Sequence, residues 1–380
     1  MSRKKVAAAF GFLAVLVPLV AWAATWVETK SPNASQFDNV LWGSDASSAT
    51  HAWAVGRADT GTLPTRKPVI LLWDGSRWRM SQNPLPRGGG ELRDVEDLGP
   101  ASAWSVGFTY STIGNDTLVE RWNGSSWSIV PSPNRSAQNF LLAVKAFGET
   151  DVWAVGSNNV PSTLFFETMV QHWNGSSWSI VPSPSPDPFE SHLLAMDGVA
   201  SDDLWAVGYT QASPDAIRSP LAMHWDGFNW QVTSIPPVND SGLEGIVALA
   251  PDDVWAVGFT FSVQLFWQVP YAIHWDGIRW TSVSIPPTSS QGGHLYDVTA
   301  LSPTEVYAVG ESGDASIPVL VMRWDGASWT VVPGPTPRSS AIAWDVTPLG
   351  SSELLLVGSS AKVRHGNLLP SKTFVVTGAP

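Results

Sequence analysis

The chain of 380 residues contains no cysteine, and charged residues make up only 14 % of it. The absence of cysteine excludes a disulfide scaffold, a thiolate zinc site and a cysteine nucleophile. Basic residues are also few, because 21 Lys and Arg stand against 33 Asp and Glu, which leaves a net charge of −12. Since contacts to phosphate need Lys and Arg, this balance argues against a nucleic-acid-binding protein.

Catalytic motifs are missing as well. The sequence contains no Ser/His/Asp order, no Gly-rich phosphate loop and no zincin spacing. Tryptophan, glycine and proline are abundant instead, with 22, 32 and 30 residues. Tryptophan and the turn-forming residues glycine and proline therefore dominate the pattern of the sequence.

The first 23 residues predict a secretory signal. Three basic residues at 3–5 precede an apolar run over 6–20, and Ala21-Trp22-Ala23 is a small-x-small cleavage site. The alternative is an uncleaved membrane anchor, since the run is about long enough to span a bilayer. We expect cleavage, a bacterial origin, a secreted or cell-envelope location and no membrane span in the mature chain.

Residues 24–380 form a single repetitive domain. The repeat is an apolar strand, Asp-Val-Trp-Ala-Val-Gly, a variable loop, His-Trp-Asp-Gly-x-x-Trp and a Pro/Ser-rich link. Its first tryptophan recurs at Trp53, Trp104, Trp153, Trp205 and Trp255, with Tyr307 and Leu355 completing the series. A period of about 50 residues with four strand-like pieces is typical of a β-propeller blade. We expect these tryptophans to pack between blades.

The ends of the chain predict how the ring closes. In the fifth unit we expect strands over 243–249, 254–259, 271–275 and 280–285. The last unit lacks a fourth strand, whereas residues 25–32 align with 126–133, so that Trp26 supplies the missing tryptophan. The sequence thus predicts an all-β, seven-bladed propeller with four antiparallel strands per blade, closed by an N-terminal strand that completes the last blade and covers its free edge.

One face of this propeller is the predicted ligand face. The connections between second and third strands are long and all different, at 57–67, 109–117, 157–168, 210–219, 260–269, 311–317 and 359–372. Variable loops on a rigid frame usually carry function. Aromatic and polar residues there, or at the adjoining channel mouth, are the candidates for ligand binding: Tyr110, Phe165, Phe166, His192, Arg218, Phe261, Phe266, Trp267, Tyr271 and His294. The open alternative is that these rings pack onto their own loops.

Carboxylates on the innermost strands suggest a second site. We align the first strands of the units on one apolar residue, which is Val40, Val95, Val144, Met196, Ile246, Val298 and Val346 in turn. The residue before it is Asn39, Asp94, Ala143, Ala195, Gly245, Asp297 and Asp345. Asp94, Asp297 and Asp345 are candidate Ca²⁺ ligands, because hard cations prefer oxygen. The alternative is that they are solvated or bonded to turns. We expect no other cofactor.

The repeat resembles a group of bacterial proteins with DVWAVG and HWNGSSW units, within the broad kelch and galactose-oxidase-like propeller class. The units are Asp151-Val152-Trp153-Ala154-Val155-Gly156 and His172-Trp173-Asn174-Gly175-Ser176-Ser177-Trp178. The resemblance covers about residues 25–380 and implies an exported β-propeller, with no particular activity. The kelch Gly-Gly doublet, the cysteine of the galactose oxidase copper site and the Asp-box of sialidases are missing.

These observations favour an exported, monomeric, non-catalytic binding propeller. Its partner would be a glycan, another polymer or a protein at the cell surface. The alternative is a secreted lyase, glycosidase or oxidoreductase that uses Asp94, Asp297, Asp345, His192 and His294 at the channel mouth.

Overall fold

Antiparallel strands build the part of the chain that the structure describes. The computed structural model describes residues 25–379 except 63–64, 112, 161–162, 164, 315–318, 338–339 and 365–366. The predicted signal segment lies outside these residues. Within them there is no helix, and hence none long and apolar enough to cross a membrane.

Twenty-eight strands lie in four-stranded antiparallel units. The units along the chain are β2 (Asn39–Ser48), β3 (His51–Asp59), β4 (Arg66–Trp73) and β5 (Trp78–Ser81); β6 (Gly90–Asp97), β7 (Ala103–Thr109), β8 (Thr117–Trp122) and β9 (Trp127–Ile129); β10 (Asn139–Gly148), β11 (Asp151–Asn159), β12 (Phe166–Trp173) and β13 (Trp178–Val181); β14 (Glu190–Ala200), β15 (Asp203–Gln211), β16 (Ser219–Trp225) and β17 (Trp230–Val232); β18 (Ser241–Ala250), β19 (Asp253–Ser262), β20 (Trp267–Trp275) and β21 (Trp280–Val283); and β22 (Gly293–Ser302), β23 (Glu305–Ser312), β24 (Leu320–Trp324) and β25 (Trp329–Val332). One parallel pair, Phe166 with Glu190, joins the third unit to the fourth.

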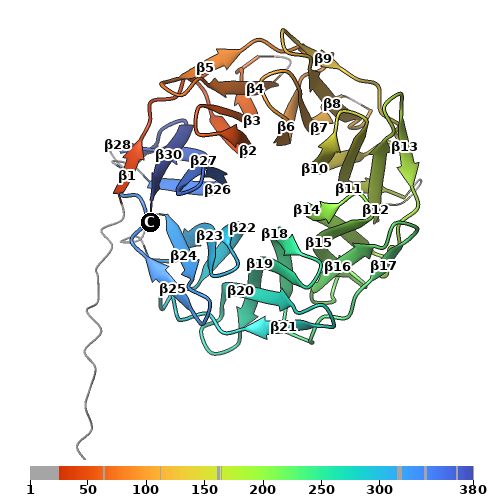
Figure 1. Cartoon of the computed structure of the whole chain (residues 1–380), viewed down its shortest axis with the longest axis vertical. Coiled ribbons are helices and arrows are strands. Elements are labelled where there is room, and N and C mark those ends of the chain that lie inside the picture. The colour runs from red at the N-terminus through yellow and green to blue at the C-terminus, as the bar shows by residue number, and fades with distance from the viewer. Residues whose placement is uncertain are drawn as a thin grey trace, which may run out of the picture.

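The last sheet combines both ends of the chain. Its order is β1 (Thr25–Glu28), β30 (Lys372–Ala379), β27 (Glu353–Ala361) and β26 (Ser340–Leu349). Trp26 pairs with Gly378, and its Nε1 donates to the carbonyl of Pro333, 2.7 Å away. β28 (Val363–Arg364) and β29 (Asn367–Leu368) form a small separate hairpin. Figure 1 shows the sheets standing around a central opening, with β2, β6, β10, β14, β18, β22 and β26 innermost.

Tryptophans from neighbouring sheets pack on one another, as the repeat predicts. Trp205 of β15 is 1 % exposed, and its ring centroid lies 4.9 Å from that of Trp275 and 5.2 Å from that of Trp280 in the next sheet. Trp53, Trp104, Trp153 and Trp255 make the same contacts with the following sheet. Each large ring removes about 150–250 Å² from water, so these contacts hold flat sheets together.

The histidines of the repeat have a local role. His274 Nε2 lies 2.8 Å from Asp253 Oδ1, and its ring packs 4.5 Å from Trp255. The same arrangement joins His172 to Asp151 and His224 to Asp203. Each histidine therefore contacts an aspartate and a tryptophan of its own sheet.

Every innermost strand carries a β-bulge. The pairing of β18 with β19 shifts between Leu243 and Gly245, so that Glu244 has no cross-strand partner. Opposite the bulge, a Cβ on Gly258 would lie 2.1 Å from the carbonyl oxygen of Gly242. The glycine that ends the Asp-Val-Trp-Ala-Val-Gly motif is thus required because strand backbones approach closely there.

Two sequence predictions of strand position are corrected. Strands β19 and β20 extend to Ser262 and from Trp267, so most of the predicted loop 260–269 is a hairpin. In the first unit, Gly43, and not Asn39, occupies the position of Asp94, because Gly43 pairs with Val55 as Asp94 pairs with Val106. Val40 lies before the bulge of its strand, whereas Val95 lies after the bulge of the next unit, so aligning these two apolar residues shifts the first unit.

Candidate functional site

The bulged residues line the central cavity. A β-bulge leaves one residue outside the ladder and redirects its side chain. The bulged residues are Trp42, Arg93, Leu142, Leu194, Glu244, Tyr296 and Trp344. All of them are half-buried and line one cavity of about 360 Å³. The same backbone feature in each sheet therefore presents aromatic, aliphatic and charged side chains to one space.

Aromatic rings cluster on one side of this cavity. The rings of Trp42 and Trp344 lie 5.1 Å apart, and Tyr296 lies 4.4 Å from Trp344. Arg93 stacks over Trp42 at 4.3 Å, a cation–π contact. Burial raises the pKa of Tyr296, and the nearby carboxylate of Glu311 raises it further, so its hydroxyl stays protonated.

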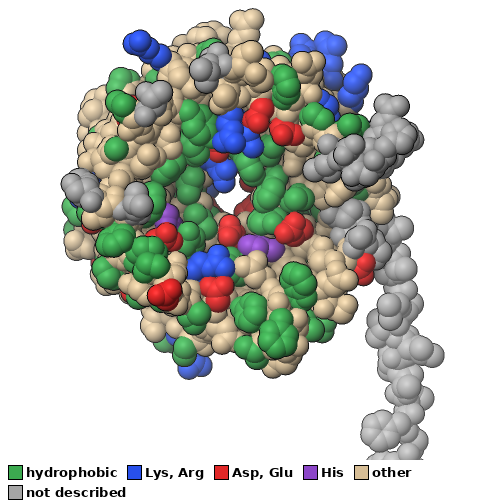
Figure 2. Space-filling view, turned by 180° about the vertical axis from the view of Figure 1, so that it is seen from behind, with side chains coloured by type: hydrophobic (Ala, Val, Ile, Leu, Met, Phe, Trp, Pro, Cys, Tyr) green, Lys and Arg blue, Asp and Glu red, His purple; other side chains and the backbone are tan. Residues whose placement is uncertain are grey.

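These rings belong to a continuous belt around the cavity. Each member contacts the next through its aromatic ring, a cation–π contact or a hydrogen bond, and the last member, Glu91, bonds to the first, Tyr110. In order, the members are Tyr110, Phe108, Phe140, Phe166, His192, Tyr209, Arg218, Phe259, His294, Tyr296, Trp344, Trp42, Arg93 and Glu91. We call this set the belt. Its members come from all the sheets, and in Figure 2 charged and histidine side chains gather around the central opening.

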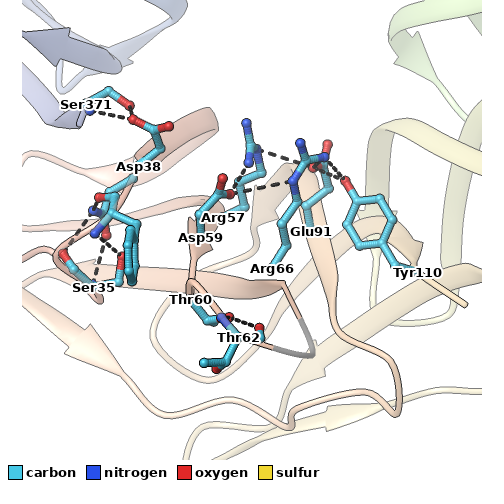
Figure 3. Close-up of polar contacts among 12 residues, drawn as sticks. Ser35, Asp38, Arg57, Asp59, Thr60, Thr62, Arg66, Glu91, Tyr110 and Ser371 are labelled. Carbon is cyan, nitrogen blue, oxygen red and sulfur yellow. Dashed lines mark hydrogen bonds and ion pairs between the residues drawn. The ribbon is translucent and has the colours of Figure 1, made fainter. Parts of the chain in front are cut away.

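A buried glutamate anchors the belt between β3 and β6. Glu91 is 3 % exposed and accepts hydrogen bonds from Arg93 Nη1 at 3.2 Å and from the hydroxyl of Tyr110 at 2.6 Å. Arg66 Nη1 donates to that hydroxyl at 2.7 Å, and Arg57 Nε lies 3.5 Å from Glu91 (Figure 3). Burial raises the pKa of Tyr110 to about 12. These groups therefore connect β3, β6 and the segment after β7 through ion pairs and hydrogen bonds.

The belt includes five of the predicted binding residues. These are Tyr110, Phe166, His192, Arg218 and His294. Burial lowers the pKa of His192 to about 4, so that it is neutral near pH 7. Arg218 makes a two-pronged ion pair with Asp240, with distances of 2.9 and 2.8 Å.

The other predicted binding residues lie away from the belt. Trp267 and Phe266 stand at the tip of the β19–β20 hairpin and are 57 % and 76 % exposed. Phe165 packs on Phe189, and half-buried Phe261 lines a separate groove. Tyr271 is 6 % exposed and packs in the core, so the prediction that it faces a ligand is wrong. Its pairing with Gly258 turns the ring between the sheets.

Below the belt, carboxylates connect neighbouring sheets. Asp94 accepts from the backbone N–H of Val144, Asp297 from that of Val346, and Asp345 from the hydroxyl of Ser44. Burial raises the pKa of Asp94 and of Asp297 to about 7. Among the described residues, no three His, Asp or Glu are placed to hold a metal ion. These carboxylates accept hydrogen bonds between sheets, and the Ca²⁺ site at Asp94, Asp297 and Asp345 stays a prediction.

Sequence reasoning missed Asp45 and the pairing of Lys145. Lys145 Nζ lies 3.0 Å from Asp197 and 3.4 Å from Glu96, and the backbone N–H of Asp97 donates to Asp45 at 2.7 Å. A signal in the sequence marks the correct register, since a fully buried leucine precedes nearly every bulge: Leu41, Leu92, Leu141, Leu193, Leu243 and Leu295.

Comparison with known proteins supports the fold and assigns no family. No family model and no curated protein matches the chain. The structure of YCF48 bound to D1 peptide is similar, with a TM-score of 0.59, 12 % identity and 94 % of each chain covered. A protein of unknown function from Dyadobacter fermentans has a TM-score of 0.54 and 12 % identity over 93 % of this chain and 98 % of that one. An ulvan lyase of the polysaccharide lyase family PL25, bound to -[GlcA(1-4)Rha3S]-, has a TM-score of 0.52 and 8 % identity over 85 % and 89 %. At these identities the likeness shows a β-propeller-like fold alone.

Proposed function

We propose that the chain is an exported, seven-bladed propeller, closed by β1, that binds a glycan or a protein segment at the belt without transforming it. One observation carries this proposal. Each innermost strand bulges at the same register, and the seven bulged residues, of five different types, face one cavity. A conserved backbone device with varied side chains is the arrangement of a binding surface on a frame.

The exposed chemistry of the belt suits such ligands. The half-buried rings of Trp42, Tyr296 and Trp344 offer flat apolar faces, and Arg93 and Glu244 lie beside them as hydrogen-bonding groups. Aromatic rings with a few polar groups bind sugar faces and apolar peptide side chains alike. Two proteins of similar fold are described with a peptide and a polysaccharide bound, which supports the same ligand classes here.

The alternative of an enzyme has less support. Asp94, Asp297 and Asp345 accept hydrogen bonds between sheets. His192 and His294 lie in different sheets, and Tyr209, Arg218 and Phe259 separate them in the belt. The residues proposed for catalysis thus have structural partners, and a binding role accounts better for the varied belt.

A thermal-shift screen tests the proposal. A panel of glycans and peptide polymers is added to the exported protein, because a ligand that binds only the native state raises the melting temperature. The double variant Trp42→Ala with Trp344→Ala should lose the shift, whereas Phe228→Ala with Ile278→Ala, at exposed turns outside the cavity, should keep it. A shift that survives loss of both belt tryptophans would place the ligand elsewhere and overturn the assignment.

A further inference from the structure

The hairpin of β19 and β20 ends in an exposed apolar tip. Beyond Gly258 its ladder continues through four residue pairs to Ser262 with Trp267, farther than any other described hairpin between second and third strands. At this tip Val263 is 53 %, Leu265 37 %, Phe266 76 % and Trp267 57 % exposed. Four apolar side chains therefore project into solvent from one turn, outside the belt.

The tip is held in a fixed conformation. The backbone N–H of Phe266 donates to the carbonyl of Ser262 at 2.8 Å, and that of Leu265 donates to the Ser262 hydroxyl at 3.3 Å. Phe266 has a φ of 58°, the only positive φ outside glycine among the described residues. Bulky residues rarely adopt this region, and such strain is kept where a side chain must be presented. The turn thus exposes both rings, while the backbone N–H groups of Leu265 and Phe266 bond to Ser262.

The outer part of the hairpin carries no charged residue. From Val254 to Ile273 the sequence contains no Asp, Glu, Lys, Arg or His. The connection between the second and third strands of the preceding sheet adds Ile217, which is 59 % exposed. The exposed residues Phe228 and Ile278, by contrast, have a charged residue close by in the chain. They follow Asp226 and Asp276 by two residues, and backbone hydrogen bonds lower the pKa of both carboxyl groups.

We propose that this tip inserts into the interface of a lipid bilayer. A narrow, convex tip cannot bury its rings in a flat protein surface, whereas it penetrates a fluid one. Insertion is favoured because the segment carries no charge, and tryptophan beside apolar residues is typical of the headgroup region. The apolar run at 6–20 brings the chain to a membrane whether it acts as a signal or as an anchor. Since the protein carries a net charge of −12, the expected surface is made of zwitterionic lipid.

This inference does not depend on the proposed function, because the belt and the tip share no residue. The two also fail separately: ligand binding is measured without lipid, and insertion is measured without glycan or peptide. Docking by the tip would hold one edge of the loop-bearing face against the membrane.

The absence of cysteine permits a direct test. Val263→Cys places a single thiol at the tip, and Ile278→Cys places one at the turn between β20 and β21, where Ile278 is 84 % exposed. Each full-length variant is labelled with a polarity-sensitive nitrobenzoxadiazole dye and mixed with phosphatidylcholine vesicles. We expect emission at residue 263 to rise severalfold and to be quenched by lipids carrying a nitroxide on the acyl chain. Emission at residue 278 should not change.

A second set of variants tests whether the exposed rings cause the response. Phe266→Ser with Trp267→Ser, in the Val263→Cys background, should abolish the response without changing the melting temperature, because both side chains are exposed. Equal responses at residues 263 and 278, or no response at residue 263, would overturn the proposal. A label at residue 263 that responds to envelope proteins but not to lipid vesicles would assign the tip to a protein partner instead.

Discussion

Oδ2 of Asp94 accepts a hydrogen bond from the backbone N–H of Val144, 2.8 Å away, and so joins the innermost strands of two neighbouring sheets. Asp197 bonds in the same way to the N–H of Ala248, and Asp297 to that of Val346. Carboxylates at the position of Asp94, or two residues further along the innermost strand, therefore connect one sheet to the next.

Removing one of these connections should destabilise the fold. Asp94→Ala leaves the N–H of Val144 without its acceptor, and an unpaired buried donor costs about 1–3 kcal/mol. We expect the free energy of unfolding to fall by about that amount. Denaturant unfolding measures the loss, and faster hydrogen exchange at the amide of Val144 locates it. Unchanged exchange at that amide would show that the bond does not hold the two strands.

Lys145 should contribute more to the stability of the fold at high pH than at low pH. Its ammonium lies between Asp197 and Glu96, and burial raises the pKa of Glu96. In Lys145→Met the carboxylates remain without a cation, which costs about 2 kcal/mol or more when they are ionised. Because the folded-state pKa of Glu96 is raised, its stabilising contribution is present below its unfolded value and is lost as pH rises. The variant should thus approach wild-type stability near pH 5 and fall behind at pH 8. A constant gap in melting temperature across this range would contradict the argument.

Glu120 is a buried carboxyl group that should limit stability above neutral pH. It is 0 % exposed, Asn83 donates to one oxygen at 3.3 Å, and the other oxygen has no partner. Burial raises its pKa to about 8. Its contribution to stability is complete below the unfolded pKa near 4.5 and declines as pH rises to about 8, by at most about 1.4 kcal/mol per pH unit.

Replacing this group by an amide should remove that pH dependence. The equivalent position in the next sheet is Gln171, whose Nε2 donates to the carbonyl of Pro133 at 2.8 Å. We expect Glu120→Gln to equal the wild type near pH 4 and to exceed it increasingly toward pH 8. Thermal unfolding at several pH values measures the difference. Parallel curves for the two proteins would mean that Glu120 does not titrate as inferred.

The N-terminal strand should be needed for a stable ring. β1 pairs with β30 along its whole length, and Trp26 packs on the core of the last sheet. Deleting residues 24–28 exposes the edge of β30, which would lower the melting temperature and promote association through that edge. Calorimetry and size-exclusion chromatography detect the two effects. A deleted form as stable and monomeric as the intact one would argue against closure by β1.

Several parts of this architecture are local properties of the sequence. Apolar alternation, the Asp-Gly or Asn-Gly turns and the spacing of Trp53, Trp104 and Trp153 determine antiparallel sheets with aromatic packing between them. Such features depend on residues close in the chain or one repeat apart, so their recurrence can be read directly. The exposed positions of Phe266 and Trp267 belong to this class, because both lie in a variable connection.

The belt, by contrast, was decided by tertiary structure. A bulged residue such as Trp42, Glu244 or Tyr296 does not differ in sequence from its neighbours, and only pairing with the next strand shows that it has left the ladder. Asp94 gave no indication that its partner is Val144, because hydrogen bonds between sheets depend on how the sheets are placed around the axis. By itself the sequence determined the repeated unit and its core; the ring decided which residues meet at the centre, because it brings together side chains that are distant along the chain.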